Sequence, residues 1–314
     1  MHKPPVLVIA GPTASGKSAL ALELAAALGG VIINADALQT YRDLRILTAR
    51  PDAAAAARVP HRLYGYLDAA ERGSAPRWCT LALAEIATAT ASGALPILVG
   101  GTGFYLRALR DGLAAIPDIS PDIRAEALAL HRALGSAAFH ARLAALDPEA
   151  AARLNPRDRQ RLVRAFEVVR TTGVPIGAWQ ARQALRTAPY RFATILLMPP
   201  REILYAAADA RFTAMIAAGA LAEAAVLAAR RLDPELPAMK AVGLPELLRH
   251  VRGEVPLADA VTAGQRATRR YAKRQTTWFR HQLTADLLLN EQFSESLLHR
   301  SRHFIDDFLL TRPP

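Results

Sequence analysis

One eight-residue stretch near the start of the chain has the composition of a phosphate-binding loop. It lies between an apolar run at 6–10 and a helical pattern from Ala19 onward. Its glycines let backbone N–H groups turn toward an anion, and the amino end of the helix adds partial positive charge. Lys17 supplies a full charge, and the Ser18 hydroxyl is a ligand for Mg²⁺. The residues expected to bind a diphosphate or triphosphate are Gly11, Pro12, Thr13, Ala14, Ser15, Gly16, Lys17 and Ser18.

A carboxylate follows the second apolar run of the chain. Asp36 stands just after residues 31–34, which have the composition of a buried strand. Ligands of parallel α/β sheets bind at the carboxyl ends of the strands, so we expect Asp36 beside the mouth of the phosphate loop. Its position alone allows three roles, namely a helix cap, a magnesium ligand acting through water, and a general base.

A third predicted strand, at 97–99, runs into a glycine-rich turn around Thr102. Glycines at 100, 101 and 103 permit a ligand to approach the backbone closely, and the Thr102 hydroxyl can donate to a phosphate or to the edge of a base. The alternative is a tight turn in which Thr102 caps the following helix.

No predicted strand ends in the apolar-apolar-Asp pattern with which hydrolytic motors hold water and Mg²⁺. The strand at 97–99 ends in glycines, and the strand at 192–197 ends in prolines. The sequence therefore argues against a hydrolytic motor but leaves room for a small-molecule kinase.

The overall charge favours a polyanionic partner. Lys and Arg number 39 against 28 for Asp and Glu, which gives a formal net charge of +11. A basic run at 157–164 opens one predicted helix, and a second basic run lies at 268–280, where we expect Lys273 and Arg274 to contact phosphates. The alternative explanations are that the net charge serves solubility and that the two basic runs are ordinary solvent-exposed helix faces. The aromatic residues of the second run are interpreted as core or interface anchors.

The alternation of short apolar runs with helical patterns predicts an α/β fold with a parallel sheet. No strand is evident between about 117 and 189, so we expect an inserted all-helical domain there, between core segments at 1–116 and 190–314. Cys79 is the single cysteine, which argues against a disulfide framework or a thiolate zinc cluster. The first apolar run is too short for a signal peptide or a membrane span, so we expect a cytoplasmic protein that does not contact membranes.

These motifs resemble, in order and over nearly the whole chain, the bacterial type of the tRNA dimethylallyltransferase family. The resemblance rests on the phosphate loop together with motifs at 36–42, 100–105, 158–168, 211–219, 240–243 and 272–278. The loop is shared by many families, whereas Asp36-Ala37-Leu38-Gln39 and the Lys-Arg-Gln…Thr-Trp run from Lys273 are specific. Family members share a P-loop NTPase-like core, which the resemblance implies here, with the helical insertion as its tRNA-contacting domain.

The resemblance also implies an activity and residue roles. The reaction is transfer of a dimethylallyl group from dimethylallyl diphosphate to the exocyclic amine of the adenosine next to the anticodon, in tRNAs that read codons beginning with U. Asp36 resembles the general base, while Thr102 and Arg211 contact the donor or the tRNA near the reaction centre. The tRNA-contacting positions are Asp36, Ala37, Leu38, Gln39, Thr102, Arg124, Gln160, Arg161, Leu162, Val163 and Arg164. We expect a monomer with Mg²⁺ as cofactor and the anticodon stem-loop of tRNA as partner.

The chain departs from the family pattern in two places. Leu47 replaces a usual glycine, Arg50 replaces a usual lysine, and Leu244-Pro245 stands where tyrosine and a polar residue are common. These departures put the local loop geometry in doubt more than the chemistry. From the residues alone, a small-molecule kinase and a noncatalytic RNA-binding nucleotide sensor remain rival hypotheses.

Overall fold

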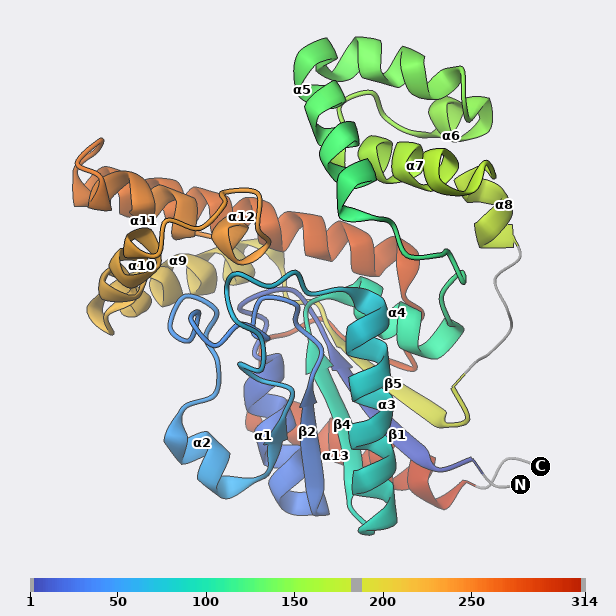
Figure 1. Ribbon diagram of the computed structural model, residues 1–314. Coiled ribbons are helices and arrows are strands. Elements are labelled where there is room, and N and C mark those ends of the chain that lie inside the picture. Colours follow the sequence, from blue (N-terminus) through green and yellow to red (C-terminus); the bar gives the residue numbers. More distant parts are fainter. Residues whose placement is uncertain (1–2, 182–187, 312–314) are drawn as a thin grey trace. The chain divides into compact units, whose positions relative to one another are not determined.

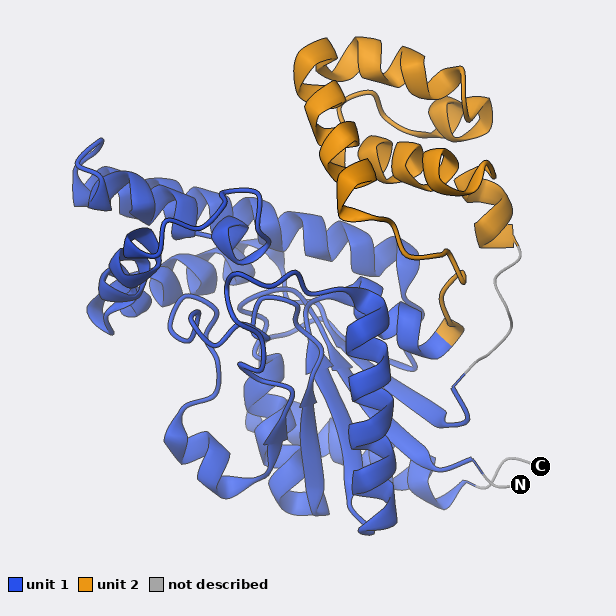
Figure 2. Cartoon of the chain, viewed as in Figure 1, with its two compact units in different colours: residues 1–110, 188–314 blue, residues 111–187 orange. Residues whose placement is uncertain are grey.

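The computed structural model describes residues 3–181 and 188–311. The chain forms two compact units, residues 1–110 with 188–314 and residues 111–187, which are coloured separately in Figure 2. Residues 182–187, which belong to the predicted helical insertion at 117–189, lie outside the described residues.

Unit 1 contains a six-stranded sheet in which every neighbouring pair is parallel, in the order β3-β2-β4-β1-β5-β6 (Figure 1). The predicted α/β fold with a parallel sheet is thereby confirmed. The four predicted strands correspond to β1 (Pro5–Ala10), β2 (Gly30–Asn34), β4 (Leu95–Gly100) and β5 (Arg191–Leu197). Two short edge strands, β3 (His61–Arg62) and β6 (Leu287–Leu289), were not predicted, because two or three residues are too few for a periodic pattern.

Helices cover both faces of this sheet. Helices α1 (Lys17–Leu28) and α13 (Glu295–Leu310) pack on one face, where they share a hydrophobic core with β1, β2, β4 and β5. Helix α3 (Ala75–Ala91) lies on the other face (Figure 1). The short helix α2 (Ala53–Arg58) forms from the alanine-rich run.

The strand register brings three loops to the same edge of the sheet. Ala10 of β1 pairs with Gly100 of β4, and Asn34 of β2 pairs with Val99 of β4. The loops that follow these strands therefore leave the sheet side by side, as the sequence predicted for the candidate site.

A second helical layer completes unit 1, around its own hydrophobic core. Its elements are α9 (Arg201–Ala217), α10 (Ala220–Ala229), the 3₁₀ turn η1 (Ala238–Lys240), α11 (Leu244–Val251) and α12 (Leu257–Gln282). Helix α4 (Gly103–Asp111) follows β4 directly. Within residues 3–181 and 188–311, no single helix has both the length and the hydropathy to cross a bilayer. Helices α9 and α10 meet these criteria only as a pair, which bends by 67°.

All secondary-structure elements in the described part of unit 2 are helices, joined by loops. The unit contains α5 (Pro121–Ala144), α6 (Pro148–Arg153), α7 (Arg159–Thr172) and α8 (Ile176–Ala181). Gly135 interrupts α5 with a positive φ of 73°, a conformation that glycine adopts without a steric penalty. Phe139 and Phe166 pack at a ring distance of 5.2 Å in the core. The buried carboxylate of Asp147 accepts hydrogen bonds from backbone amides on α6 and α8, which joins these helices.

Candidate active site

The phosphate loop joins β1 to α1 at the carboxyl edge of the sheet. Gly16, at the amino end of α1, has a φ of 89°, and a Cβ there would lie 2.7 Å from the Cβ of Phe293. Gln292 donates to the carbonyl of Ala14 at 3.2 Å, so the segment before α13 supports the loop from behind. The Lys17 ammonium donates to the Pro12 carbonyl at 3.2 Å. The loop is therefore a tight backbone turn that ends at a helix amino terminus, where anions bind favourably.

The surroundings of Lys17 destabilise its charged form. Burial lowers the pKa of Lys17 to about 8, the carboxylate of Asp36 opposes this shift, and the guanidinium of Arg211 adds to it. Desolvation destabilises the charged form of a lysine, and a bound anion would restore that stability. The electrostatics of the site thus favour a negatively charged ligand.

Asp36 occupies a turn that its neighbours hold firmly. Asn34 donates to the carbonyls of Asp36 and Leu63, both at 3.0 Å, and the indole of Trp78 donates to the Asn34 carbonyl at 2.7 Å. One carboxylate oxygen of Asp36 accepts from the Leu38 amide at 3.0 Å. That bond stabilises a local turn, because the next helix begins only at Ala53, so the predicted role as a helix cap is wrong. The carboxylate also lines the cavity described below.

Thr102 ties the glycine-rich turn to the Asp36 turn. Its hydroxyl oxygen accepts from the Ala37 amide at 2.9 Å, and its own amide donates to the Ala35 carbonyl at 3.2 Å. A Cβ on Gly100 would lie only 2.1 Å from that carbonyl oxygen, so glycine is required for this approach. Thr102 therefore binds the residue beside Asp36, rather than capping α4 through its side chain.

Arg211 brings a third element to the phosphate loop. It lies on α9, and its Nη2 donates to the hydroxyl of Thr13. Burial lowers the pKa of Arg211, and the negative charge of Asp36 opposes that shift. The Nε of Arg211 is buried without a hydrogen-bond partner among the described residues, so one strong donor is available to a ligand. The structure thus brings together Asp36, Arg211 and the phosphate loop, which are far apart in sequence.

A cavity joins these groups, and its lining has a polar and an apolar part. Thr13, Asp36 and Arg211 form the polar part. The rest of the lining is mostly apolar and comprises Leu38, Leu47, Thr48, Ala208, Phe212, Met215, Val242, Thr268 and Tyr271. A molecule with an anionic head and a short hydrocarbon tail fits this distribution.

Several of these lining residues were not singled out from the sequence as ligand-binding. Ala208, Phe212 and Met215 are such residues; they lie at i, i+4 and i+7 on α9, on the same face as the predicted site residue Arg211 at i+3, a signal that helical periodicity contains. Tyr271, interpreted from the sequence as a core or interface anchor, lines the cavity instead. Phe279, eight residues further along α12, is buried in the core, as the sequence predicted.

The loop at 45–50, where the chain departs from the family pattern, is fixed from both sides. The carboxylate of Glu223 on α10 accepts from the amides of residues 45, 46 and 47 at 2.7, 2.8 and 3.0 Å. Gln39 donates to the carbonyls of Thr48 and Ala49 at 2.8 and 3.2 Å. These bonds place the side chain of Leu47 in the cavity wall. The sequence carried no signal for Glu223, because its partner loop lies more than 170 residues away.

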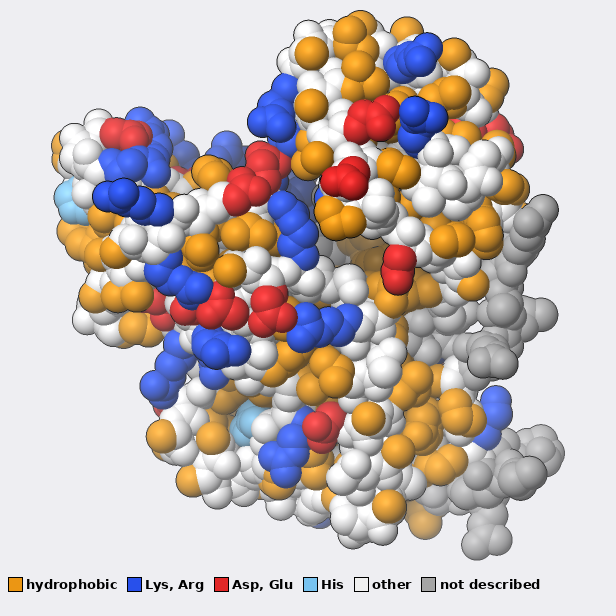
Figure 3. Space-filling view, in the orientation of Figure 1, with side chains coloured by type: hydrophobic (Ala, Val, Ile, Leu, Met, Phe, Trp, Pro, Cys, Tyr) orange, Lys and Arg blue, Asp and Glu red, His pale blue; other side chains and the backbone are white. Residues whose placement is uncertain are grey.

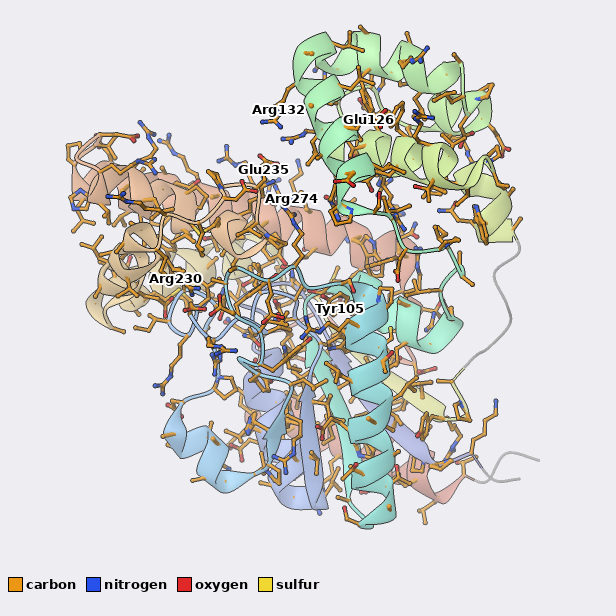
Figure 4. The ribbon with its side chains drawn as sticks, in the orientation of Figure 1. Tyr105, Glu126, Arg132, Arg230, Glu235 and Arg274 are labelled. Carbon is orange, nitrogen blue, oxygen red and sulfur yellow. The ribbon has the colours of Figure 1, made fainter. Side chains whose placement is uncertain are left out.

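The basic residues of α12 divide into paired and exposed ones. Arg269 forms an ion pair with Asp209, whereas Lys273 and Arg274 are exposed. Arg274, labelled in Figure 4, lies with its guanidinium 5.6 Å from the ring of Tyr271. On the visible face of unit 1 in Figure 3, basic side chains are interspersed with acidic ones. The net positive charge is thus not one continuous patch on that face.

In unit 2, the predicted tRNA-contacting residues differ in exposure. Gln160, Arg161 and Arg164 on α7 are exposed, as is Arg124 on α5. Leu162 and Val163 are 0% and 6% exposed, and their side chains belong to the helical core. The buried carboxylate of Glu167 lies 3.7 Å from Arg124 and 3.6 Å from Arg164, so it holds these two guanidinium groups on one surface.

The site offers few direct ligands for a metal ion. Within the described residues, no group of three or more His, Cys, Asp and Glu side chains is placed to hold one. Ser18, in the first turn of α1, is exposed and lines a second cavity with Asp52 and Tyr64. Mg²⁺ commonly takes one or two protein ligands and completes its shell with water and substrate phosphate, so Ser18 fits such an ion.

The parallel sheet, the phosphate loop and a cavity with both polar and apolar lining define a P-loop type of α/β protein with a site for a phosphorylated substrate. A family model described as IPP transferase matches residues 39–282, and one described as isopentenyl transferase matches residues 4–72. The chain belongs to this family of isopentenyl transferases.

Known relatives agree with this assignment over most of their length. A Rhodospirillum centenum protein named tRNA dimethylallyltransferase is 61% identical over 284 residues, 90% of each chain. A Rhodospirillum rubrum protein of the same name is 56% identical and covers 98% of this chain and 96% of its own. A eukaryotic dimethylallyltransferase, described as acting on tRNA, superposes with a TM-score of 0.83 at 27% identity, covering 99% of this chain and 80% of its own. The tRNA isopentenylpyrophosphate transferase of Bacillus halodurans superposes with a TM-score of 0.70 at 31% identity, covering 97% and 96%.

Proposed function

We propose that this protein is a tRNA dimethylallyltransferase. It transfers the dimethylallyl group of dimethylallyl diphosphate to the exocyclic amine of the adenosine on the 3′ side of the anticodon, in tRNAs that read codons beginning with U, and it releases diphosphate. The observation that carries this proposal is the cavity, whose lining combines Thr13 of the phosphate loop, Asp36 and Arg211 with mostly apolar side chains. Family membership selects the prenyl group as the hydrocarbon.

The phosphate loop stabilises the leaving group. As the allylic carbon–oxygen bond breaks, negative charge grows on the departing diphosphate, and Lys17, Arg211 and the amino end of α1 face that charge. Fixed donors aimed at developing charge are worth about 10²–10³ in rate each. Mg²⁺ held by Ser18 and the diphosphate would add Lewis-acid stabilisation of the same charge.

Asp36 accepts the proton of the attacking amine. The lone pair of an adenine amine is delocalised into the ring, so the nitrogen gains positive charge only as it bonds to carbon. A carboxylate is too weak a base to deprotonate the neutral amine first, so proton transfer accompanies or follows attack. The adenine must also leave the anticodon-loop stack to reach the cavity, as other base-modifying enzymes require.

Exposed basic residues, together with one exposed glutamine, hold the tRNA backbone. We assign this role to Lys273 and Arg274 on α12, and to Arg124, Gln160, Arg161 and Arg164 of unit 2, which we propose to be the tRNA-contacting helical insertion. The buried positions of Leu162 and Val163 support an indirect part for them, in shaping the surface that carries their neighbours. Thr102 and residues 36–39 are assigned to the adenosine and its neighbours. One chain supplies all these groups, which supports a monomer, and a tRNA substrate supports action in the cytoplasm.

The direct test is to incubate the protein with unmodified tRNA, dimethylallyl diphosphate and Mg²⁺, and to weigh the nucleosides after digestion. We expect prenylated adenosine and one diphosphate per transfer. Consumption of ATP without prenyl transfer would instead favour the kinase, and binding of a nucleotide with no turnover would favour the sensor.

A further inference from the structure

Gln275 is a buried amide whose two ends bind two different loops of the site. It lies on α12 and is 6% exposed. Its Oε1 accepts from the Thr13 amide at 2.8 Å, and its Nε2 donates to the Gly101 carbonyl at 2.8 Å. A buried amide that satisfies two buried backbone groups stabilises the geometry of both.

Each of these two loops is hydrogen-bonded to a residue to which a role in the reaction was assigned, or to its neighbour in the chain. Thr13 belongs to the phosphate loop, and its hydroxyl accepts from Arg211. Gly101 precedes Thr102, whose hydroxyl binds the amide next to Asp36. One side chain therefore spans from the part of the site that holds the leaving group to the part that holds the base.

The packing around Gln275 leaves no room for a side chain on the glycine-rich turn. A Cβ on Gly101 would lie 2.3 Å from the Nε2 of Gln275, but 3.4 Å from the nearer Asp36 oxygen. A Cβ on Gly103 would lie 2.0 Å from the ring of Trp278, one turn further along α12. The two glycines thus allow α12 to press directly on the turn.

We propose that Gln275 is a positioning residue that sets the separation between the phosphate loop and the Asp36–Thr102 turn. It fixes both to α12, whose exposed face carries Lys273 and Arg274. This inference rests on the proposed function. A displacement of about 1 Å between reacting groups costs about 10²-fold in rate, so Gln275 acts on the chemical step while making no contact with either substrate.

The first experiment compares Gln275→Met with Gln265→Met, a matched control on the same helix. Gln265 is half-buried and bonds to α9 through Asp209 and Thr213, away from the loops of the site. We expect Gln275→Met to lower kcat about 10- to 100-fold. Its dissociation constant for tRNA should stay within about twofold, because the charges that bind phosphate are unchanged. Gln265→Met should keep its kcat, while its Tm falls by a comparable amount.

Gln275→Glu tests the hydrogen bond to Thr13 separately from the hydrogen bond to Gly101. A carboxylate can still accept from the Thr13 amide, but it cannot donate to the Gly101 carbonyl. We expect kcat to fall, and KM for dimethylallyl diphosphate to rise, because a negative charge then stands beside the phosphate loop.

A double-mutant cycle tests the bridge even if Gln275→Met folds poorly. In the wild-type background, Gly101→Ala should reduce kcat strongly, because the new methyl group collides with Gln275. In a Gln275→Ala background the same substitution should cost at least about tenfold less, since the colliding atom is gone.

Two results would overturn the positioning role: equal kcat for Gln275→Met and Gln265→Met, or additive effects in the cycle. Both are measured against a wild-type protein that makes prenylated adenosine. If the wild type makes none, the proposed function itself fails, and the two failures are thereby distinguished.

Discussion

The polar and the apolar part of the candidate site are built in different ways. The phosphate-binding groups come mostly from one stretch, residues 11–18, which follows β1 and includes the first residues of α1, and Arg211 on α9 adds one distant donor. The apolar wall comes mainly from the loop at 45–50, from α9 and from α12, and Glu223 on α10 binds that loop through the Leu47 amide. Local sequence thus supplies most of the anion-binding groups, and tertiary packing determines what else fits beside them.

The largest expected effect concerns Asp36, the carboxylate in the polar part of the cavity. Asp36→Ala should lower kcat about 10²- to 10⁴-fold, because the proton of the attacking amine loses its acceptor. Binding of tRNA, measured by filter retention, should remain near the wild-type level. Asp36→Asn serves as the control of equal size, and wild-type turnover by either variant would remove Asp36 from the mechanism.

The next largest effect is expected at Lys17, and it concerns only the binding of the diphosphate. The pKa of Lys17 is lowered to about 8, so the ammonium is mostly charged at pH 7 and mostly neutral at pH 9. Since the diphosphate binds the charged form, KM for dimethylallyl diphosphate should rise about tenfold between these pH values. In Lys17→Arg, whatever its activity, the guanidinium stays charged and this rise should disappear. A wild-type KM that is flat from pH 7 to 9 contradicts the assignment.

A smaller effect is expected at the loop 45–50, which forms part of the apolar lining of the cavity. Glu223→Gln removes part of the acceptor that binds three amides of the 45–50 loop, and should lower the free energy of unfolding by about 1–2 kcal/mol. KM for dimethylallyl diphosphate should rise several-fold, because Leu47 is no longer fixed against the cavity. Glu85→Gln, which breaks a surface ion pair with Arg62, is the matched control. Equal donor KM values in the two variants would show that the loop holds its place without Glu223.

The smallest effects belong to single phosphate contacts. Lys273→Ala should weaken tRNA binding only a few-fold, and should reduce the slope of log K against log salt by about 1. Lys240→Ala, which breaks an ion pair with Glu235, controls for loss of a positive charge elsewhere. An unchanged slope in Lys273→Ala would remove that residue from the tRNA interface.

The same contrast explains what the sequence could and could not predict. The four central strands, the phosphate loop and Asp36 followed from local patterns, because strand period and turn chemistry act over a few residues. Glu223, Gln275 and the cavity-facing role of Tyr271 did not, because each depends on which distant backbone or side chain the fold places beside it. Their residue types, a helix glutamate, a helix glutamine and a helix tyrosine, are unremarkable in isolation.

A carry-over from a family by position does not separate side chains by burial. Leu162 and Val163 lie in a stretch that the resemblance predicts to contact tRNA, and helical periodicity turns both side chains toward the core of unit 2. The exposed members of that stretch are the polar ones, and an alternation of polar and apolar letters at helical spacing would have separated them.

The support behind the phosphate loop has a consequence for how the protein matures. Gln292 reaches Ala14 across 278 positions of the chain, and Phe293 lies against Gly16. During synthesis the loop therefore emerges well before the residues that support it. A chain that stops before Gln292 would carry the recognisable motif without this support, so we expect tight diphosphate binding only once the segment before α13 has been made.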